Sequence, residues 1–323
     1  MKKRRLRVGV LTSGGDAPGM NAVIRAVVRS ALHFNMRIYG IRGGFEGLFR
    51  ADMYEMESQD VSDIIHRGGT ILRTDRCQEM RTPEGQQRAA NYLQAVQMDA
   101  VIVIGGDGSF KGAQALANQG IKVVCIPATI DLDMHCTEYT IGFDTAVNTA
   151  TNAMSCLRDT SSSHDRCGIV EVMGRNAGHL ALWCAIASGA DEVSTPENPL
   201  NISAVLEQIT INRAKGKRHH LVVVAEGVGN ANQLAEELEN LQDEEARATI
   251  LGHMQRGGTP TAMDRMQGSV MGFKAVEAIH NGQFNKAIVF QKGEHALMDL
   301  DQAIETTQSH STQLYDLTKI LAI

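Results

Sequence analysis

The sequence is poor in aromatic residues, which therefore cannot supply most of a hydrophobic core. Phenylalanine, tryptophan and tyrosine make up 4% of the 323 residues, whereas hydrophobic residues as a whole make up 43%. A chain of this length and content can bury one large core or two medium ones. The core must therefore be built mainly from aliphatic side chains.

The sequence also lacks any regular arrangement of cysteines. Its six cysteines include no CxxC pair, and most of them lie among apolar residues. This pattern is typical of buried free thiols and disfavours both a disulfide framework and a structural zinc site. We expect reduced cysteines and a cytoplasmic protein.

An excess of basic charge and a long apolar run are absent as well. The formal net charge is −6, which disfavours a general surface for nucleic acids or membranes. No apolar segment approaches the length that spans a bilayer. Basic residues precede an apolar stretch at the start, but Arg7 and Gly9 interrupt that stretch and it ends at Ser13. We expect the first strand there and not a secretion signal.

Strand-like and helix-like segments alternate along the whole chain, which favours an α/β fold with two lobes. No linker or low-complexity segment separates the lobes. The pattern restarts beyond Gly142, and we expect the chain to cross back near Gly257. The predicted ranges are 1–142 with 257–305 for the larger lobe and 143–256 with 306–323 for the smaller one.

The stretch DAVIVIGGDGSF, at 99–110, is the clearest local signal. A short apolar run closed by glycines indicates a buried strand that turns tightly into a helix near Gly108. The N–H groups of such a turn, together with the helix dipole, bind anions, and Asp107 can hold a Mg2+ that neutralises bound phosphates. A second glycine turn, SGGDAPG at 13–19, also follows a strand, so both loops can face one ligand.

The segment PATIDLD, at 127–133, follows another predicted strand. In an extended segment Asp131 and Asp133 point to one side and Leu132 to the other. One carboxylate can accept a proton from a substrate hydroxyl while the other helps Asp107 to hold a metal ion. An Asp-rich turn that only caps the next element is the alternative.

Basic residues gather in two sets. The first set lies beside glycines or at strand ends, where guanidinium groups suit phosphate oxygens; it comprises Arg73, Arg76, Arg81, Arg166, Arg175, Arg247, His253 and Arg256. The second set lies at the amino end of a predicted strand and on the first helix; it comprises Lys215, Lys217, Arg218, His219, Arg25 and Arg29. For the second set, a solvated rim and a regulatory anion site both remain open.

Eight stretches together resemble the bacterial ATP-dependent 6-phosphofructokinases, in the family's order and over nearly the whole chain. They are GVLTSGGDAPGMNA, HRGGT, VIVIGGDGS, TIDLD, LRDTSSSHDR, EVMGR, AKGKRH and LGHMQRGGTP. The resemblance implies the phosphofructokinase fold, with two Rossmann-like three-layer α/β/α lobes and mostly parallel sheets. It also implies a cytoplasmic glycolytic homotetramer with shared active sites. Its substrates would be ATP with Mg2+ and fructose 6-phosphate, and ADP or phosphoenolpyruvate its possible effectors.

The resemblance also implies roles for individual residues. Asp131 would be the base for the sugar 1-hydroxyl, Thr129 would bind the transferring phosphoryl group, and Arg76 and Arg175 would stabilise that group. Asp107 and, through water, Asp133 would hold Mg2+. The ATP site would comprise Gly15, Arg76, Cys77, Gly106, Asp107, Gly108 and Ser109. The sugar-phosphate site would comprise Thr129, Asp131, Asp133, Met173, Gly174, Arg175, Glu226, His253 and Arg256, with Arg166 and Arg247 contributed by a neighbouring subunit. The effector site would comprise Arg25, Arg29, Arg158, Asp191, Lys215, Lys217 and Arg218.

Several positions depart from the family's usual pattern. Leu132 replaces an asparagine, Cys77 a phenylalanine near the adenine, and Asp191 a glutamate. Ser58 stands where the effector site has an arginine. Gly108 stands where pyrophosphate-dependent relatives have an aspartate, and Ala128 where they have a lysine. We therefore expect ATP as the donor.

Two other functions remain open at this point. One is a kinase that uses pyrophosphate or another ketose phosphate. The other is a weakly catalytic regulatory relative that binds nucleotide or sugar phosphate, an alternative suggested by Leu132, Ala128 and Cys77.

Overall fold

The computed structural model describes residues 4–217, 219–229, 231–242, 245–307 and 312–321. Its Cα positions divide the chain into two compact units. The first consists of Met1–Thr129, Met134–Asp144 and Arg256–Thr307, and the second of Ile130–Asp133, Thr145–Gln255 and Gln308–Ile323. The sequence predicted breaks after 142, before 257 and after 305, and it did not separate 130–133 from the larger lobe.

The first unit is built on a mostly parallel sheet with the strand order β12-β11-β5-β4-β1-β2-β3. Its strands are β1 (Arg7–Ser13), β2 (Arg37–Ile41), β3 (Met53–Met56), β4 (Ala100–Gly105), β5 (Val123–Thr129), β11 (Lys286–Gln291) and β12 (Glu294–Asp299). The five inner strands run parallel, whereas β3 and β12 pair antiparallel at the two edges. The short β6 (Ile141–Gly142) pairs with the end of β5.

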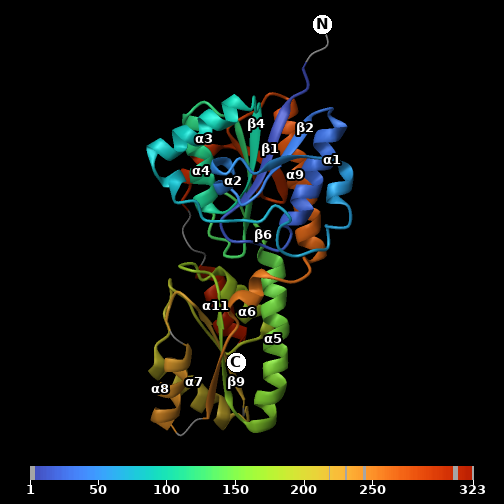
Figure 1. The fold of residues 1–323 in the computed structure, drawn as a ribbon. Helices are drawn as coiled ribbons and strands as arrows, with labels where there is room; N and C mark the ends of the chain where they lie inside the picture. The colour runs from blue at the N-terminus through green and yellow to red at the C-terminus, as the bar shows by residue number, and fades with distance from the viewer. Residues whose placement is uncertain (1–3, 218, 230, 243–244, 308–311, 322–323) are drawn as a thin grey trace. The chain divides into compact units, whose positions relative to one another are not determined.

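Helices cover both faces of this sheet, with α1 and α9 on one side and α2, α3 and α4 on the other (Figure 1). The helices are α1 (Met20–His33), α2 (Glu46–Phe49), α3 (Pro83–Ala95), α4 (Asp107–Asn118), α9 (Ala262–His280) and α10 (Leu300–Glu305). Short 3-10 helices lie at Ser58–Val61 and Glu79–Arg81, and a further one at Gly252–Arg256 belongs to the second unit up to Gln255. Gly272 allows α1 and α9 to pack closely, because a Cβ atom there would lie 2.8 Å from the carbonyl oxygen of Val23.

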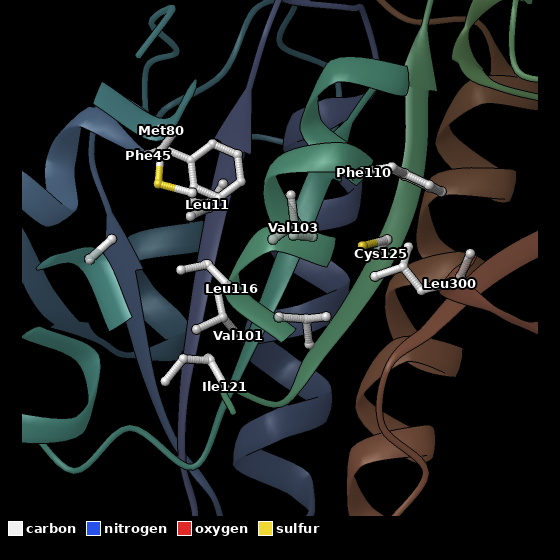
Figure 2. Close-up of a cluster of buried hydrophobic side chains, with 14 of the residues drawn as sticks. Leu11, Phe45, Met80, Val101, Val103, Phe110, Leu116, Ile121, Cys125 and Leu300 are labelled. Carbon is white, nitrogen blue, oxygen red and sulfur yellow. The ribbon is translucent and has the colours of Figure 1, made fainter. Parts of the chain in front are cut away.

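Strand β4 is made of aliphatic and small residues and is buried on both of its faces. All six of its residues are buried. Val101 and Val103 point into the cluster that packs under α4, together with Phe110 and Leu116 (Figure 2). Side chains alternate between the faces of a strand, so the intervening residues face the opposite helix layer. The expected aliphatic core is therefore present.

The second unit contains a parallel sheet in the order β10-β7-β9-β8. Its strands are β7 (Cys167–Val172), β8 (Glu192–Ser194), β9 (His220–Ala225) and β10 (Ala246–Ile250). Its helices are α5 (Phe143–His164), α6 (His179–Ser188), α7 (Ile202–Ala214), α8 (Ala231–Gln242) and α11 (Thr312–Leu321). An aliphatic cluster that includes Ile169, Val222 and Leu238 forms its core.

Some elements differ from the sequence-based expectation. The edge strands β3, β8 and β12 were not predicted. Among the described residues, no helix combines the length and the apolarity that crossing a bilayer requires.

Candidate active site

In the first unit, the two glycine turns lie side by side because the strands before them are neighbours. β1 and β4 pair in parallel, with Ser13 opposite Gly105. The Ser109 hydroxyl donates a hydrogen bond to the Ser13 carbonyl at 3.0 Å. A Cβ atom at Gly105 would lie 2.4 Å from Ser109 Oγ, so the approach requires glycine. The predicted nucleotide residue Ser109 thus holds the two loops together.

The N-terminus of α4 has no side-chain cap and carries an acidic side chain in its first turn. Gly106 precedes the helix and provides no side-chain cap. Asp107 is the first helical residue, and its Oδ2 lies 2.7 Å from Lys111 Nζ. No atom lies within 4 Å of where a Cβ of Gly108 would be. A helix start with this open space can receive a phosphate group.

Of three other predicted residues, Arg256 packs against the first glycine turn, and Arg76 and Cys77 follow Thr74, whose hydroxyl donates to the Gly14 carbonyl at 2.7 Å. Arg256 packs over Gly15, because a Cβ there would lie 2.5 Å from Arg256 Nη1, and the same nitrogen donates to the Asp16 carbonyl at 3.2 Å. Arg76 is exposed. Cys77 is half-buried against the core, and burial raises the pKa of its thiol.

The segment after β5 differs from the extended conformation that the sequence predicted. β5 ends at Thr129, and Leu132 has φ +52°. Asp131 is fully buried, whereas Asp133 is half-buried. The prediction of simple alternation was therefore wrong, because a residue with left-handed backbone breaks the two-residue period of a strand. Asparagine tolerates this conformation better than leucine does.

In the second unit, Asp131 and Arg175 form an ion pair. Arg175 Nε lies 3.2 Å from Asp131 Oδ2. The loop after β7 carries Arg175, whose φ is +52°, and its backbone N–H donates to Glu226 Oε1 at 2.8 Å. The predicted base, one predicted phosphoryl-binding arginine and one predicted sugar-binding carboxylate thus belong to one connected group. The guanidinium compensates the charge of the buried carboxylate.

Arg166 and Arg247 also come together, and both contact Glu245. Arg166 Nε lies 2.7 Å from Glu245 Oε2, and Arg247 Nη2 lies 2.9 Å from Glu245 Oε1. Arg247 also pairs with Glu239 at 2.8 Å. A cavity of about 60 Å³ is lined by both arginines and by Thr160. The Arg166 guanidinium lowers the pKa of Glu245.

The remaining predicted sugar-site residues follow β7 and β10. The Met173 N–H donates to Gln255 Oε1 at 3.3 Å, and Gly174 has φ +132°. His253 is exposed in the 3-10 helix Gly252–Arg256. The buried Gln255 thus connects the segment after β10 with the end of β7.

Among the predicted effector residues, Asp191 and Lys217 form an ion pair. Asp191 also accepts the Leu221 N–H at 2.8 Å. Burial by itself raises the pKa of Asp191, but hydrogen bonds from His220 and Lys217 hold it below its ordinary value. Arg158 instead donates to the Gly189 carbonyl at 2.8 Å. This network ties Asp191 to the interior.

The other effector residues are distributed between the two units. Arg25 and Arg29 lie on α1 of the first unit, and Lys215 is exposed at the end of α7 in the second. Ser58 is exposed at the start of a 3-10 helix. Arg218 lies outside the described residues.

Within the part of the chain that the structure describes, the predicted metal-binding residues Asp107 and Asp133 do not belong to a preformed metal site. Among the described residues, no group of three or more His, Cys, Asp or Glu side chains is arranged to hold a metal. Asp133 Oδ1 is buried and has no hydrogen-bond partner in the described chain. Mg2+ in phosphate-transferring sites is typically bound by one or two carboxylates together with phosphate oxygens and waters. Asp107 in the first unit and Asp133 in the second each offer carboxylate oxygens of the kind that such an ion takes.

Sequence reasoning did not identify Glu245, Gln255 or Glu197. Glu197 accepts the Gly178 N–H at 2.9 Å, at the start of α6. These residues contact the predicted site residues or the loop that carries them, and Glu197 and Glu245 lie outside the glycine-rich stretches. Charge and spacing gave no signal for them, since their role depends on contacts between distant segments.

Comparisons with known proteins agree on one family. The model of a family described as phosphofructokinase matches residues 7–279. A curated ATP-dependent 6-phosphofructokinase from Clostridium botulinum is 50% identical over 315 residues, which cover 98% of this chain and 99% of that protein. A second relative, ATP-dependent 6-phosphofructokinase 1 from Clostridium perfringens, is 49% identical with the same coverage.

A solved structure gives the same result for the fold. The phosphofructokinase from Saccharomyces cerevisiae superposes with a TM-score of 0.87 at 33% identity. The match covers 99% of this chain and 48% of the yeast chain, so this chain spans about half the length of that relative.

Proposed function

Because this chain belongs to the phosphofructokinase family, as the matches over nearly its whole length establish, we propose that it phosphorylates fructose 6-phosphate in glycolysis. It transfers the γ-phosphoryl group of ATP to the sugar 1-hydroxyl and gives fructose 1,6-bisphosphate and ADP. The family and the fold expected from the sequence are confirmed. The observation that carries the assignment of the base is the buried Asp131 in its ion pair with Arg175.

The first unit supplies the proposed nucleotide site. The open helix start at Gly108 leaves room for a phosphate group and directs backbone N–H groups toward it. Ser109 fixes the loop, Arg256 packs on the Gly15 turn, and Arg76 extends into solvent for the transferring phosphoryl group. We assign the adenine to the side of the half-buried Cys77.

ATP-dependent members of this family use ATP together with Mg2+. Asp107 and Asp133 would hold the ion in this chain, because each offers carboxylate oxygens and Asp133 has a buried one without a partner among the described residues. The ion would supply positive charge to the phosphate oxygens when bound. Lys111 lies beside Asp107 and compensates its charge in the free protein.

The second unit supplies the proposed base and its partners. Asp131 accepts the proton of the sugar 1-hydroxyl as the oxygen attacks the γ-phosphorus. Arg175 pairs with Asp131 in the free protein and stabilises the transferring phosphoryl group during the reaction, together with Arg76 and Thr129. Phosphoryl transfer depends mainly on alignment and charge stabilisation. The connected group of Asp131, Arg175 and Glu226 supplies both.

Binding of the sugar phosphate uses residues from two subunits in this proposal. Met173, Gly174, Glu226, His253 and Arg256 contact the sugar. The pair Arg166 and Arg247 lines the cavity of about 60 Å³ and binds the 6-phosphate of a neighbouring subunit. We propose a cytoplasmic homotetramer with shared active sites, as the family resemblance implies.

The effector site is proposed at Arg25, Arg29, Arg158, Asp191, Lys215, Lys217 and Arg218, with ADP or phosphoenolpyruvate as the ligand. Asp191 already neutralises Lys217, and Ser58 removes one expected cation. We therefore expect a weak effector response. The measurement is activity at subsaturating fructose 6-phosphate with and without each effector, and a strong response would contradict the expectation.

The donor is tested by one experiment. A coupled assay offers fructose 6-phosphate with either MgATP or Mg-pyrophosphate to the purified protein. We expect faster turnover with ATP, because an aspartate at position 108 would fill the space that is open here. Faster turnover with pyrophosphate would overturn the donor assignment, and negligible turnover with both donors would favour the regulatory alternative.

A further inference from the structure

The loop that carries Arg175 holds an energetically unfavourable backbone. Arg175 has φ +52°, a left-handed conformation that costs about 1 kcal/mol or more for a residue with a Cβ atom. Such a conformation persists where the surrounding structure fixes it. The loop joins β7 to α6, so the contacts at both of its ends decide where the guanidinium lies.

Two turns clamp the loop from outside. A Cβ atom at Gly227 would lie 2.0 Å from the Arg175 carbonyl oxygen and 2.9 Å from Pro196 Cγ. A Cβ atom at Gly178 would lie 2.3 Å from Thr195 Cβ. The backbone of the loop therefore lies directly against the turn at 195–198 and the segment at 226–229.

Glu197 completes the clamp at the start of α6. Gly178 precedes the helix and offers no side-chain cap of its own. Its N–H donates to Glu197 Oε1 at 2.9 Å. A carboxylate at a helix N-terminus is favourable because of the helix dipole. Glu197 therefore replaces the missing cap and fixes the end of the Arg175 loop.

The C-terminal helix α11 reaches this clamp through Tyr315. The Tyr315 hydroxyl hydrogen bonds to Thr195 Oγ1, and Thr195 is fully buried. Burial, together with the nearby Glu197 carboxylate, raises the pKa of the phenol. Thr195 begins the turn that carries Glu197, since its hydroxyl accepts the Asn198 N–H at 3.2 Å. The phenol thus holds the turn whose carboxylate caps α6.

We propose that Tyr315 is a positioning residue for Arg175 and acts through Glu197 and the Gly178 N–H. The inference rests on the role of Arg175 proposed above. Without the Tyr315 hydroxyl, Thr195 loses a hydrogen bond that fixes the turn at 195–198, and the Glu197 carboxylate on that turn can move away from Gly178. The Arg175 loop then leaves its left-handed conformation, and the guanidinium is less often in place for the transferring phosphoryl group.

The test compares Tyr315→Phe with a control on the same helix. Tyr315→Phe should lower kcat by about three- to tenfold, the effect of one hydrogen bond, with the KM values for both substrates nearly unchanged. Thr318→Ala removes a hydrogen bond to the Tyr315 carbonyl but leaves the phenol in place, so kcat should stay at the wild-type level. Equal losses of kcat in both variants would overturn the proposal, because they would indicate general loosening of α11.

A second pair of variants tests whether the hydrogen bond that Glu197 accepts is what matters for kcat. Glu197→Gln keeps an oxygen that can accept the Gly178 N–H and should retain most of kcat, whereas Glu197→Ala should match Tyr315→Phe. A Glu197→Ala variant with wild-type kcat would contradict the proposal.

A double-mutant cycle distinguishes this inference from the assignment of Arg175 itself. In an Arg175→Lys background, Tyr315→Phe should cause little further loss, because the group that it positions is already replaced. An unchanged fractional loss would overturn the positioning role while leaving the proposed function intact. Wild-type kcat in Arg175→Lys alone would refute the role of Arg175, and with it this inference.

Discussion

Gly108 offers a substitution for which we expect stability and nucleotide affinity to change in opposite directions. It is the second residue of α4, with negative φ, and no atom lies within 4 Å of where its Cβ would be. Alanine in a helix is more favourable than glycine by roughly 0.5–1 kcal/mol. Gly108→Ala should therefore increase the free energy of unfolding by up to about that amount.

The same methyl group should weaken ATP binding. We place a phosphate of ATP at the start of α4, and the methyl group would occupy the space through which the phosphate approaches the backbone. Overpacking of this kind costs about 1–3 kcal/mol, so the KM for ATP should rise about fivefold or more. The KM for fructose 6-phosphate should stay nearly constant.

Two assays and one control variant test this reasoning. Thermal unfolding without ligands gives the stability, and steady-state kinetics give both KM values. Gly105→Ala is the control in the same loop, since its Cβ would lie 2.4 Å from Ser109 Oγ, and it should lower the unfolding temperature. The reasoning is refuted if Gly108→Ala lowers the unfolding temperature or leaves the KM for ATP unchanged.

Three further substitutions test other parts of the account. Leu132→Asn replaces a leucine in a left-handed conformation and should raise the free energy of unfolding, measured in urea titrations, by up to about 1 kcal/mol. A variant less stable than the wild type would show that the backbone at Leu132 is not strained. Glu245→Gln removes the carboxylate that Arg166 and Arg247 share, so the KM for fructose 6-phosphate should fall about two- to fivefold, and an unchanged KM would show that Glu245 does not compete with the phosphate. The pKa of Asp191 is lowered in the folded protein, so its charge contributes stability above its unfolded pKa and that contribution is lost as the pH falls through the lower folded value. The free energy of unfolding of Asp191→Asn should therefore fall less than that of the wild type when the pH is lowered from about 6 to about 3. An equal fall in both proteins would contradict a charge-stabilising role for the contacts of Asp191 described above.

Much of the first unit could be predicted from local sequence. Aliphatic runs closed by glycines identified β1 and β4 and the turns after them, because buried parallel strands and tight turns leave strong local patterns. The start of α3 also carries a local pattern, since Pro83 is its first residue and the Thr82 hydroxyl accepts the Gly85 N–H at 3.1 Å. The edge strands β3 and β12 left no comparable pattern, since most of their residues are exposed or only partly buried, and β8 has only three residues.

The contacts within the site depended on tertiary structure. The glycine turns at 13–19 and 105–109 could be placed near each other because their strands are parallel. The left-handed backbone of Leu132 and Arg175 could not be predicted, since both residue types normally avoid it. The carboxylates of Glu197 and Glu245 also gave no signal, because partners distant in the sequence determine their roles.

The assignment of Asp131 as the base for the sugar hydroxyl is tested most directly by Asp131→Asn in an assay with saturating MgATP. The isosteric amide keeps the shape of the buried side chain but cannot accept the proton. We predict that kcat falls about a hundredfold to ten-thousandfold while the KM for fructose 6-phosphate changes little. A variant that retains wild-type kcat would contradict the account.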